Sequence, residues 1–187
     1  IDNTPDNTPS LVVTRDMLPQ IVLSLENVNR EFPDLKKDAE GVGDQDNVSA
    51  ASITKDPTDT AKDLEASGRV HGYNSAYSSE DLSLTVVSSV DMFETSDSAK
   101  SFLARHIADY NEFEGVEISE GLLIKEFKEI APPTIGTDTR RGQYIAIALG
   151  FDVYGNFIIW RRGNAVAMVS VVSFEELNLY ESLKQLS

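Results

Sequence analysis

The stretch Gln143–Phe174 constrains the fold more than any other part of the chain, because it predicts three consecutive antiparallel strands. Its runs of β-branched and aromatic residues cover Tyr144–Phe151, Phe157–Arg162 and Ala165–Ser173. We expect the first turn at Asp152–Asn156 and the second at Gly163–Asn164, where glycine accepts the positive φ of a two-residue hairpin turn. Both alternating sets of the last run are largely apolar, so we expect that strand to be covered on both faces.

The other apolar patterns predict helices and hairpin strands around this meander. Helices are expected at Met17–Phe32, at Asp59–Ala66, after a cap at Thr95 or Ser96 with an apolar stripe from Ala99 to Tyr110, and at Phe174–Leu186. Strands are expected at Arg69–Ser78, Leu82–Phe93 and Glu117–Ile130. Asp34–Lys55 and Thr134–Gly142 lack a sustained period and are expected to be turn-rich surface segments. Because the helices interrupt the strands without alternating with them, the order favours the α+β class, with a single twisted antiparallel sheet and packed helices.

The length and composition indicate one domain that follows a flexible N-terminal segment. A chain of 187 residues with 41% hydrophobic residues can bury one sizeable core. We expect a flexible N-terminal tether over residues 1–13, which repeats Asn-Thr-Pro, followed by a single domain over 14–187. Such a tether is typical of the segment after a removed signal peptide or lipid anchor, so we expect an extracytoplasmic protein.

The charge and the missing cysteine narrow the function classes. A formal net charge of −15 opposes contact with nucleic acids, which are polyanions. The absence of cysteine excludes disulfides, zinc–thiolate sites and cysteine nucleophiles. No apolar run reaches the roughly 20 residues that span a bilayer. We therefore expect no nucleic-acid partner and no membrane-spanning segment, although a lipid tether fits the N-terminus.

Polar-tipped aromatic residues and an arginine pair are the candidate ligand-binding side chains. Aromatic surfaces with polar tips can line a ligand cleft, and an arginine fork can clamp a carboxylate or phosphate. The candidate ligand-binding residues are His71, Tyr73, Tyr77, Trp160, Arg161 and Arg162, and Tyr154 is a further tyrosine that could line the same cleft. Neither a phosphate-binding glycine loop nor a nucleophile elbow is present, so we assign no catalytic residue, no metal ligand and no cofactor.

Two alternative functions remain open. His71 or His106 can titrate near neutral pH, and with a carboxylate either could serve a small-molecule hydrolase or another enzyme. Asp44 and Asp46 resemble the start of a calcium loop, although the glycine and distal glutamate of an EF-hand are missing. A calcium-dependent structural or adhesion module is therefore the second alternative.

Short motifs also carry a family resemblance. The run Gly68–Tyr73, the helix start near Ser98, the turn at Ile135 and the strand end Arg161–Asn164 resemble bacterial exported proteins and lipoproteins. The order of strands and helices over about Arg69–Leu186 is similar to the PsbP-like α/β/α sandwich. This resemblance implies an extracytoplasmic, non-enzymatic accessory or binding domain, with a protein or a small molecule as its partner.

Overall fold

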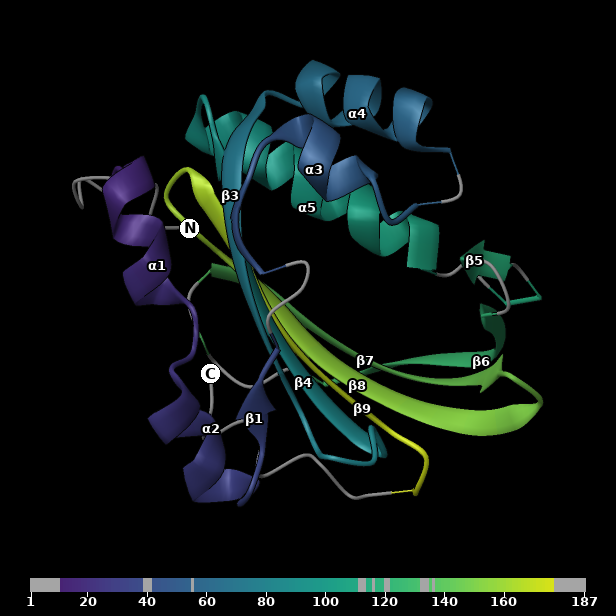
Figure 1. Cartoon of the computed structure of the whole chain (residues 1–187). Helices are drawn as coiled ribbons and strands as arrows, with labels where there is room; N and C mark the ends of the chain where they lie inside the picture. The colour runs from purple at the N-terminus through teal and green to yellow at the C-terminus, as the bar shows by residue number, and fades with distance from the viewer. Residues whose placement is uncertain are drawn as a thin grey trace, which may run out of the picture.

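A nine-stranded antiparallel sheet organises the chain, with helices packed against it (Figure 1). The computed structural model describes residues 11–38, 42–54, 56–110, 114–115, 117–119, 122–131, 135 and 137–176. The helical segments are η1 (Arg15–Met17), α1 (Leu18–Ile21), α2 (Leu25–Glu31), α3 (Asn47–Ala51), α4 (Pro57–Ala66) and α5 (Ser96–Tyr110). The strands are β1 (Lys36–Lys37), β2 (Gly43–Gln45), β3 (Arg69–Ser78), β4 (Leu84–Phe93), β5 (Glu117–Ser119), β6 (Leu122–Ile130), β7 (Thr137–Ala148), β8 (Phe151–Arg162) and β9 (Ala165–Ser173). The predicted α+β class with one antiparallel sheet is confirmed.

The strand order joins a hairpin to a meander. Across the sheet the order is β1, β3, β4, β9, β8, β7, β6 and β5, and β2 also pairs with β3. The meander β5–β9 and the hairpin β3–β4 meet where β4 pairs with β9, with Leu84 opposite Ser173. This contact between distant segments makes one continuous sheet.

Successive side chains of β9 point to opposite faces of the sheet and pack into different hydrophobic clusters. This confirms that both faces of the strand are covered. Val169 and Val171 pack with Val28 of α2 on one face. Val166 packs with Leu103 of α5 on the other. In Figure 1, α5 crosses one face of the sheet, while α1 and α2 lie along its other side. Burial of such side chains supplies most of the stability of a fold of this kind.

The meander itself is longer than its sequence pattern predicts. Its first turn lies at Leu149–Gly150, where both residues have positive φ, 52° and 85°. Two positive φ values in succession are those of a tight type I′ hairpin turn. The predicted turn at Asp152–Asn156 is therefore wrong, and these residues continue β8. The expectation of turns throughout Thr134–Gly142 is also wrong, because β7 already begins at Thr137.

The predicted helix Met17–Phe32 is broken into two by an extended link. Val22 has a ψ of 153°, and the side chain of Ser24 accepts a hydrogen bond from Asn27 N as the N-cap of α2. Leu23 N donates to Ser88 Oγ at 3.1 Å, so the sheet takes up a backbone donor that a continuous helix would have used. The six apolar residues at helical spacing in this segment are therefore only partly buried: Leu18, Val22, Val28 and Phe32 belong to the core, whereas Ile21 and Leu25 are exposed.

The segment Asp34–Lys55 contains secondary structure that the sequence pattern did not predict. β2 lies beside β3 with Asp44 opposite Tyr73, so these residues extend the sheet. Asp46 then accepts a hydrogen bond from Ser49 N at 2.7 Å and caps α3. Elements of three and five residues are too short to produce a readable period, which explains the error.

Several other predictions are confirmed with small changes of boundary. α4, the β3–β4 hairpin and α5 lie where the sequence places them, and Thr95 Oγ1 caps α5 by accepting from Ser98 N at 3.0 Å. Within the predicted strand Glu117–Ile130, the described residues form two paired strands, β5 and β6, and not one. The predicted helix Phe174–Leu186 falls almost entirely outside the described residues.

Val13, the last residue of the predicted tether, is part of the core. It is 3% exposed and packs with Leu18 of α1. Its backbone N donates to Asn164 Oδ1 at 2.7 Å, which ties the start of the chain to the β8–β9 turn. Residues 1–10 lie outside the described part, so the tether over residues 1–13 and the domain over 14–187 stay predictions.

The turn between β3 and β4 contains a carboxylate held by three hydrogen bonds. Asp81 Oδ1 accepts from Ser79 Oγ at 2.7 Å, from Ser83 Oγ at 2.8 Å and from Ser83 N at 3.1 Å. These bonds favour the charged carboxylate, with the Ser79 hydroxyl contributing most, and lower the pKa of Asp81 from 3.8 to about 2.

We expect Asp81→Asn to change how stability depends on acid. The stabilisation from a lowered carboxyl pKa is present above the ordinary value of 3.8 and is lost as the pH falls through about 2. The melting temperature of the wild type should therefore exceed that of the variant near neutral pH, and the gap should shrink from pH 3.8 to about 2. Circular dichroism melts across this range measure the gap. A difference in melting temperature that stays constant over this pH range would show that the three hydrogen bonds do not favour the carboxylate.

Candidate functional site

A groove of about 860 Å³ over β6, β7 and β8 is the candidate functional site. Its polar lining residues are Glu114, Glu126, Lys128, Gln143, Tyr144, Tyr154, Asn156 and Glu176. Six of them lie on three adjacent strands, Glu114 precedes β5, and Glu176 follows the end of β9. A concave surface with a few convergent polar groups is the usual form of a ligand site.

The groove begins where the apolar cover of the sheet ends. One row of cross-strand neighbours runs through Tyr77, Val86, Val171, Asn156, Gln143 and Lys128. The first three belong to the core under α2, and the last three line the groove. Among the described residues, the two clusters that pack on α1 and α2 include none from β6 or β7. The row of cross-strand neighbours therefore changes from covered apolar side chains to polar ones between two adjacent strands, at the step from Val171 of β9 to Asn156 of β8.

A pair of amide side chains, the buried Asn156 and the half-buried Gln143, lies at the centre of the polar half of this row. Asn156 is 4% exposed, and its Oδ1 accepts a hydrogen bond from Gln143 Nε2 at 2.6 Å. A buried amide must find hydrogen-bond partners, because its desolvation is otherwise unfavourable. Glu126 and Lys128 are exposed. The groove thus combines a hydrogen-bonding floor with charges of both signs.

Tyr144 also lines the groove, but its side chain alternates with that of Gln143 along β7 and belongs to the face of the sheet that α5 covers. It packs with Phe157 and Val166 in the cluster under α5. Burial raises the pKa of the Tyr144 phenol, and a hydrogen bond with Ser170 partly opposes that shift. The phenol is therefore a neutral group at ordinary pH, which can give or accept a hydrogen bond but cannot supply charge.

The predicted aromatic site residues share one face, but α1 and α2 cover that face. Tyr77 is 2% exposed, and its hydroxyl donates to Leu23 O. Tyr73 and Trp160 are partly buried against the cluster that includes Leu18 of α1. The structure thus brings these three side chains together as packing groups. Their role in ligand binding stays a prediction.

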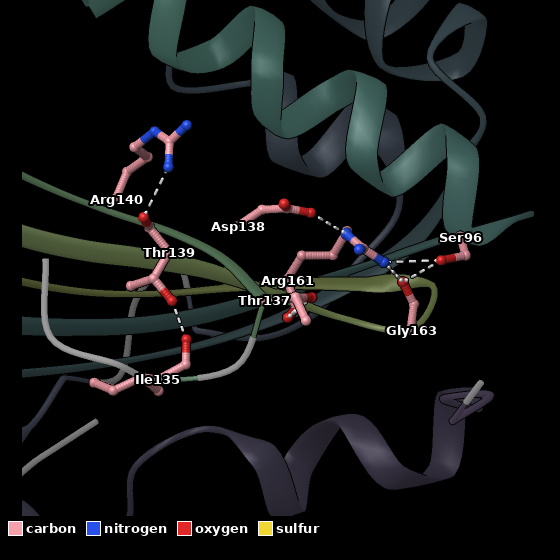
Figure 2. A network of polar contacts seen from close by, with 8 residues as sticks. All are labelled: Ser96, Ile135, Thr137, Asp138, Thr139, Arg140, Arg161 and Gly163. Carbon is pink, nitrogen blue, oxygen red and sulfur yellow. Dashed lines mark hydrogen bonds and ion pairs between the residues drawn. The ribbon is translucent and has the colours of Figure 1, made fainter. Parts of the chain in front are cut away.

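Arg161 lies at the centre of a polar network between β7, β8 and the start of α5 (Figure 2). Its Nε donates to Asp138 Oδ2 at 2.8 Å, and its Nη1 donates to Ser96 Oγ at 2.8 Å and to Gly163 O at 3.1 Å. Thr137 Oγ1 donates to Arg161 O at 3.0 Å. The guanidinium therefore has partners within the chain. Arg162 is exposed and, by alternation along β8, points to the opposite face.

His71 meets a carboxylate outside the groove. Its Nε2 lies 3.2 Å from Asp44 Oδ1, and Asp44 Oδ2 accepts a hydrogen bond from Arg15 Nη2 at 2.9 Å. Both contacts favour the charged carboxylate and lower the pKa of Asp44, and the hydrogen bond from Arg15 contributes most. His71 is 7% exposed and does not line the groove. His106 belongs to α5, but its side chain lies outside the described part, so the enzyme alternative stays a prediction.

The aspartates of the predicted calcium loop have partners within the chain. Asp44 contacts Arg15 and His71, and Asp46 caps α3. No group of three potential metal-ligating side chains occurs among the residues that the structure describes. The calcium alternative stays a prediction, and it requires that calcium compete with Arg15 for Asp44.

The fold has a counterpart among solved structures. It is similar to the crystal structure of the extracellular domain of PknH from Mycobacterium tuberculosis, with a TM-score of 0.62 over 95% of this chain and 96% of that chain. The two sequences are 12% identical, so the likeness concerns the fold alone. No protein-family model matches the chain, and neither does any curated protein sequence. Over the described residues, no helix has the length and hydrophobicity to cross a membrane.

Of the groove residues, the sequence indicated only Tyr154, as one of the tyrosines that could line a ligand cleft. Asn156 was missed because it fell in the turn wrongly predicted at Asp152–Asn156. Gln143 and Asn156 meet only through the register of β7 on β8. One signal was available, because a polar Asn just before the apolar run Phe157–Trp160 is unusual in a buried strand.

Proposed function

We propose that the chain is an extracytoplasmic, non-enzymatic binding domain that holds a small polar ligand in the groove over β6, β7 and β8. The observation that carries this proposal is the hydrogen bond between the half-buried Gln143 and the buried Asn156 at the centre of the polar half of the sheet. Amides donate and accept hydrogen bonds, which suits a ligand with both kinds of group. Glu126 and Lys128 offer charges of both signs to the same ligand.

The extracytoplasmic location is supported by two independent features. The fold is shared with the extracellular domain of PknH, and the N-terminal sequence has the composition of a tether. A lipid anchor and membership of the PsbP-like group fit the same view and belong to this proposal. Fractionation of the native cells tests the location: we expect the protein outside the cytoplasm, and recovery in the cytoplasm would exclude this part of the proposal.

Ligand screening by thermal shift tests the groove. A ligand present at about 100 times its Kd stabilises the folded chain by about 2.7 kcal/mol, which for this length raises the melting temperature by roughly 5–10 °C. We expect such a ligand to stabilise the wild type and the control Ile53→Ala, which changes a side chain 80% exposed and outside the groove. Tyr154→Ala should weaken the shift strongly. An equal shift in all three proteins would place the ligand elsewhere.

A further inference from the structure

Within the part of the chain that the structure describes, the outer edge of β6 is open over most of its length. One side of β6 pairs with β7 from Leu122 to Ile130. On the other side β5 pairs only with Leu122 and Leu123, and Gly115 N donates to Ile124 O at 2.8 Å. Among the described residues no strand pairs with this side beyond Ile124. An open strand edge presents unpaired backbone groups and invites a further strand.

The sequence of this edge is complementary to its own reverse. It reads Ile124-Lys125-Glu126-Phe127-Lys128-Glu129-Ile130. When two copies run antiparallel with Phe127 opposite Phe127, Glu126 faces Lys128 in both directions. In the same register Lys125 faces Glu129, and Ile124 faces Ile130. Opposite charges directly across two strands stabilise the pair, whereas like charges destabilise it.

Backbone geometry restricts the possible registers. Successive residues of a strand point their backbone groups to opposite edges and their side chains to opposite faces. Two identical antiparallel strands can therefore pair only when a residue lies opposite its own copy. If Glu126 lay opposite its own copy, Lys125 would face Phe127. If Lys128 lay opposite its own copy, Phe127 would face Glu129. Only the centre at Phe127 matches every charge with its opposite.

The side chains at this edge are placed for such a contact. Glu126 and Lys128 are exposed, and no ion pair joins either to another described residue. Lys125 already contacts Asp152 at 2.9 Å, and the register shift between Ile124 and Glu126 disturbs pairing there. The Glu126 and Lys128 pairs would therefore carry most of the contact, with the Phe127 rings meeting at the two-fold axis.

Charged residues and bulges on an edge strand commonly serve to prevent pairing between sheets. Here the order of the charges opposes that role, because it makes one register attractive. We infer that two copies of this chain associate through antiparallel pairing of their β6 edges about a two-fold axis at Phe127. The net charge of −15 on each copy opposes this association over long range, so the contact is weak and needs physiological salt to screen the repulsion.

Molecular mass in solution tests the inference. Sedimentation equilibrium at about 0.15 M salt, over about 1 µM to 1 mM protein, should show the wild type passing from one chain to two. Glu126→Lys and Lys128→Glu each place two pairs of like charges across the axis, so each variant alone should stay a single chain. The double variant E126K/K128E restores opposite charges and should dimerise as the wild type does.

A mixture of the two single variants is the sharpest measurement. Each supplies the charge that the other lacks, so the mixture should form a heterodimer although neither variant associates alone. The mass of the wild type staying at one chain throughout would overturn the inference, and so would single variants that dimerise normally or a mixture that stays monomeric. Circular dichroism melts of each variant confirm that it is folded. Because Glu126 and Lys128 also line the groove, the ligand test uses Tyr154, and the two proposals can fail separately.

Discussion

Replacing Gly155 by valine is expected to destabilise the fold by about 3 kcal/mol, at the upper end for an overpacked core position. Gly155 lies opposite Tyr144, whose ring covers it: a Cβ added at Gly155 would fall 2.0 Å from Tyr144 Cζ. The ring is half-buried in the cluster under α5 and hydrogen-bonded to Ser170. It cannot move aside without losing both the packing and the hydrogen bond. Urea denaturation measures the loss of free energy of unfolding.

A double-mutant cycle separates this clash from other effects of valine. Tyr144→Ala removes the ring and should itself destabilise the fold, because it leaves a gap beside Phe157. In that background Gly155→Val should have little further effect, or should restore stability by filling the gap. The two substitutions would then be strongly non-additive, as expected for residues in contact. If the losses instead simply add, the ring over Gly155 does not explain the cost.

The elements with long internal periods were predictable, because their signal is local. The alternation in Ala165–Ser173 and the helical pattern of α5 depend on nearby residues alone, and the structure confirms both. The broken helix before Phe32 was not predictable, because the break depends on Ser88, a residue of β4 far along the sequence. The turn at Leu149 was missed because leucine rarely adopts positive φ.

Apart from Tyr154, the candidate site was missed for the same physical reason. Its row of polar residues exists only because β6, β7 and β8 pair in one register, which places Lys128, Gln143 and Asn156 side by side. Sequence spacing carries no record of that register. The aromatic residues chosen from the sequence have the right chemistry for a ligand site, but Tyr77 is used by the core under α2. Polar-tipped aromatic residues serve both purposes, and only tertiary packing distinguishes them.

Arg69→Met is expected to destabilise the fold by about 3 kcal/mol, because it leaves a carboxylate without its partner. The Arg69 side chain is 2% exposed, and its Nε donates to Asp91 Oδ1 at 2.7 Å. Its Nη1 donates to Asn47 Oδ1 at 2.8 Å, and Asn47 Nδ2 donates back to Arg69 O at 3.1 Å, which fastens α3 to β3. The guanidinium lies over Gly72, where an added Cβ would fall 2.2 Å from Arg69 Nη2.

Two comparisons identify the cause of this loss. Lys62→Met removes a similar charge from the exposed pair with Asp59 and should change stability by less than about 1 kcal/mol. Adding Asp91→Asn to Arg69→Met removes the unpaired charge and should recover part of the loss, because Asp91 is 28% exposed and water can solvate the amide. Equal effects of Arg69→Met and Lys62→Met would show that the buried pair contributes no more than a surface one. Hydrogen exchange should also show faster opening of α3 in Arg69→Met, since Asn47 loses its guanidinium partner.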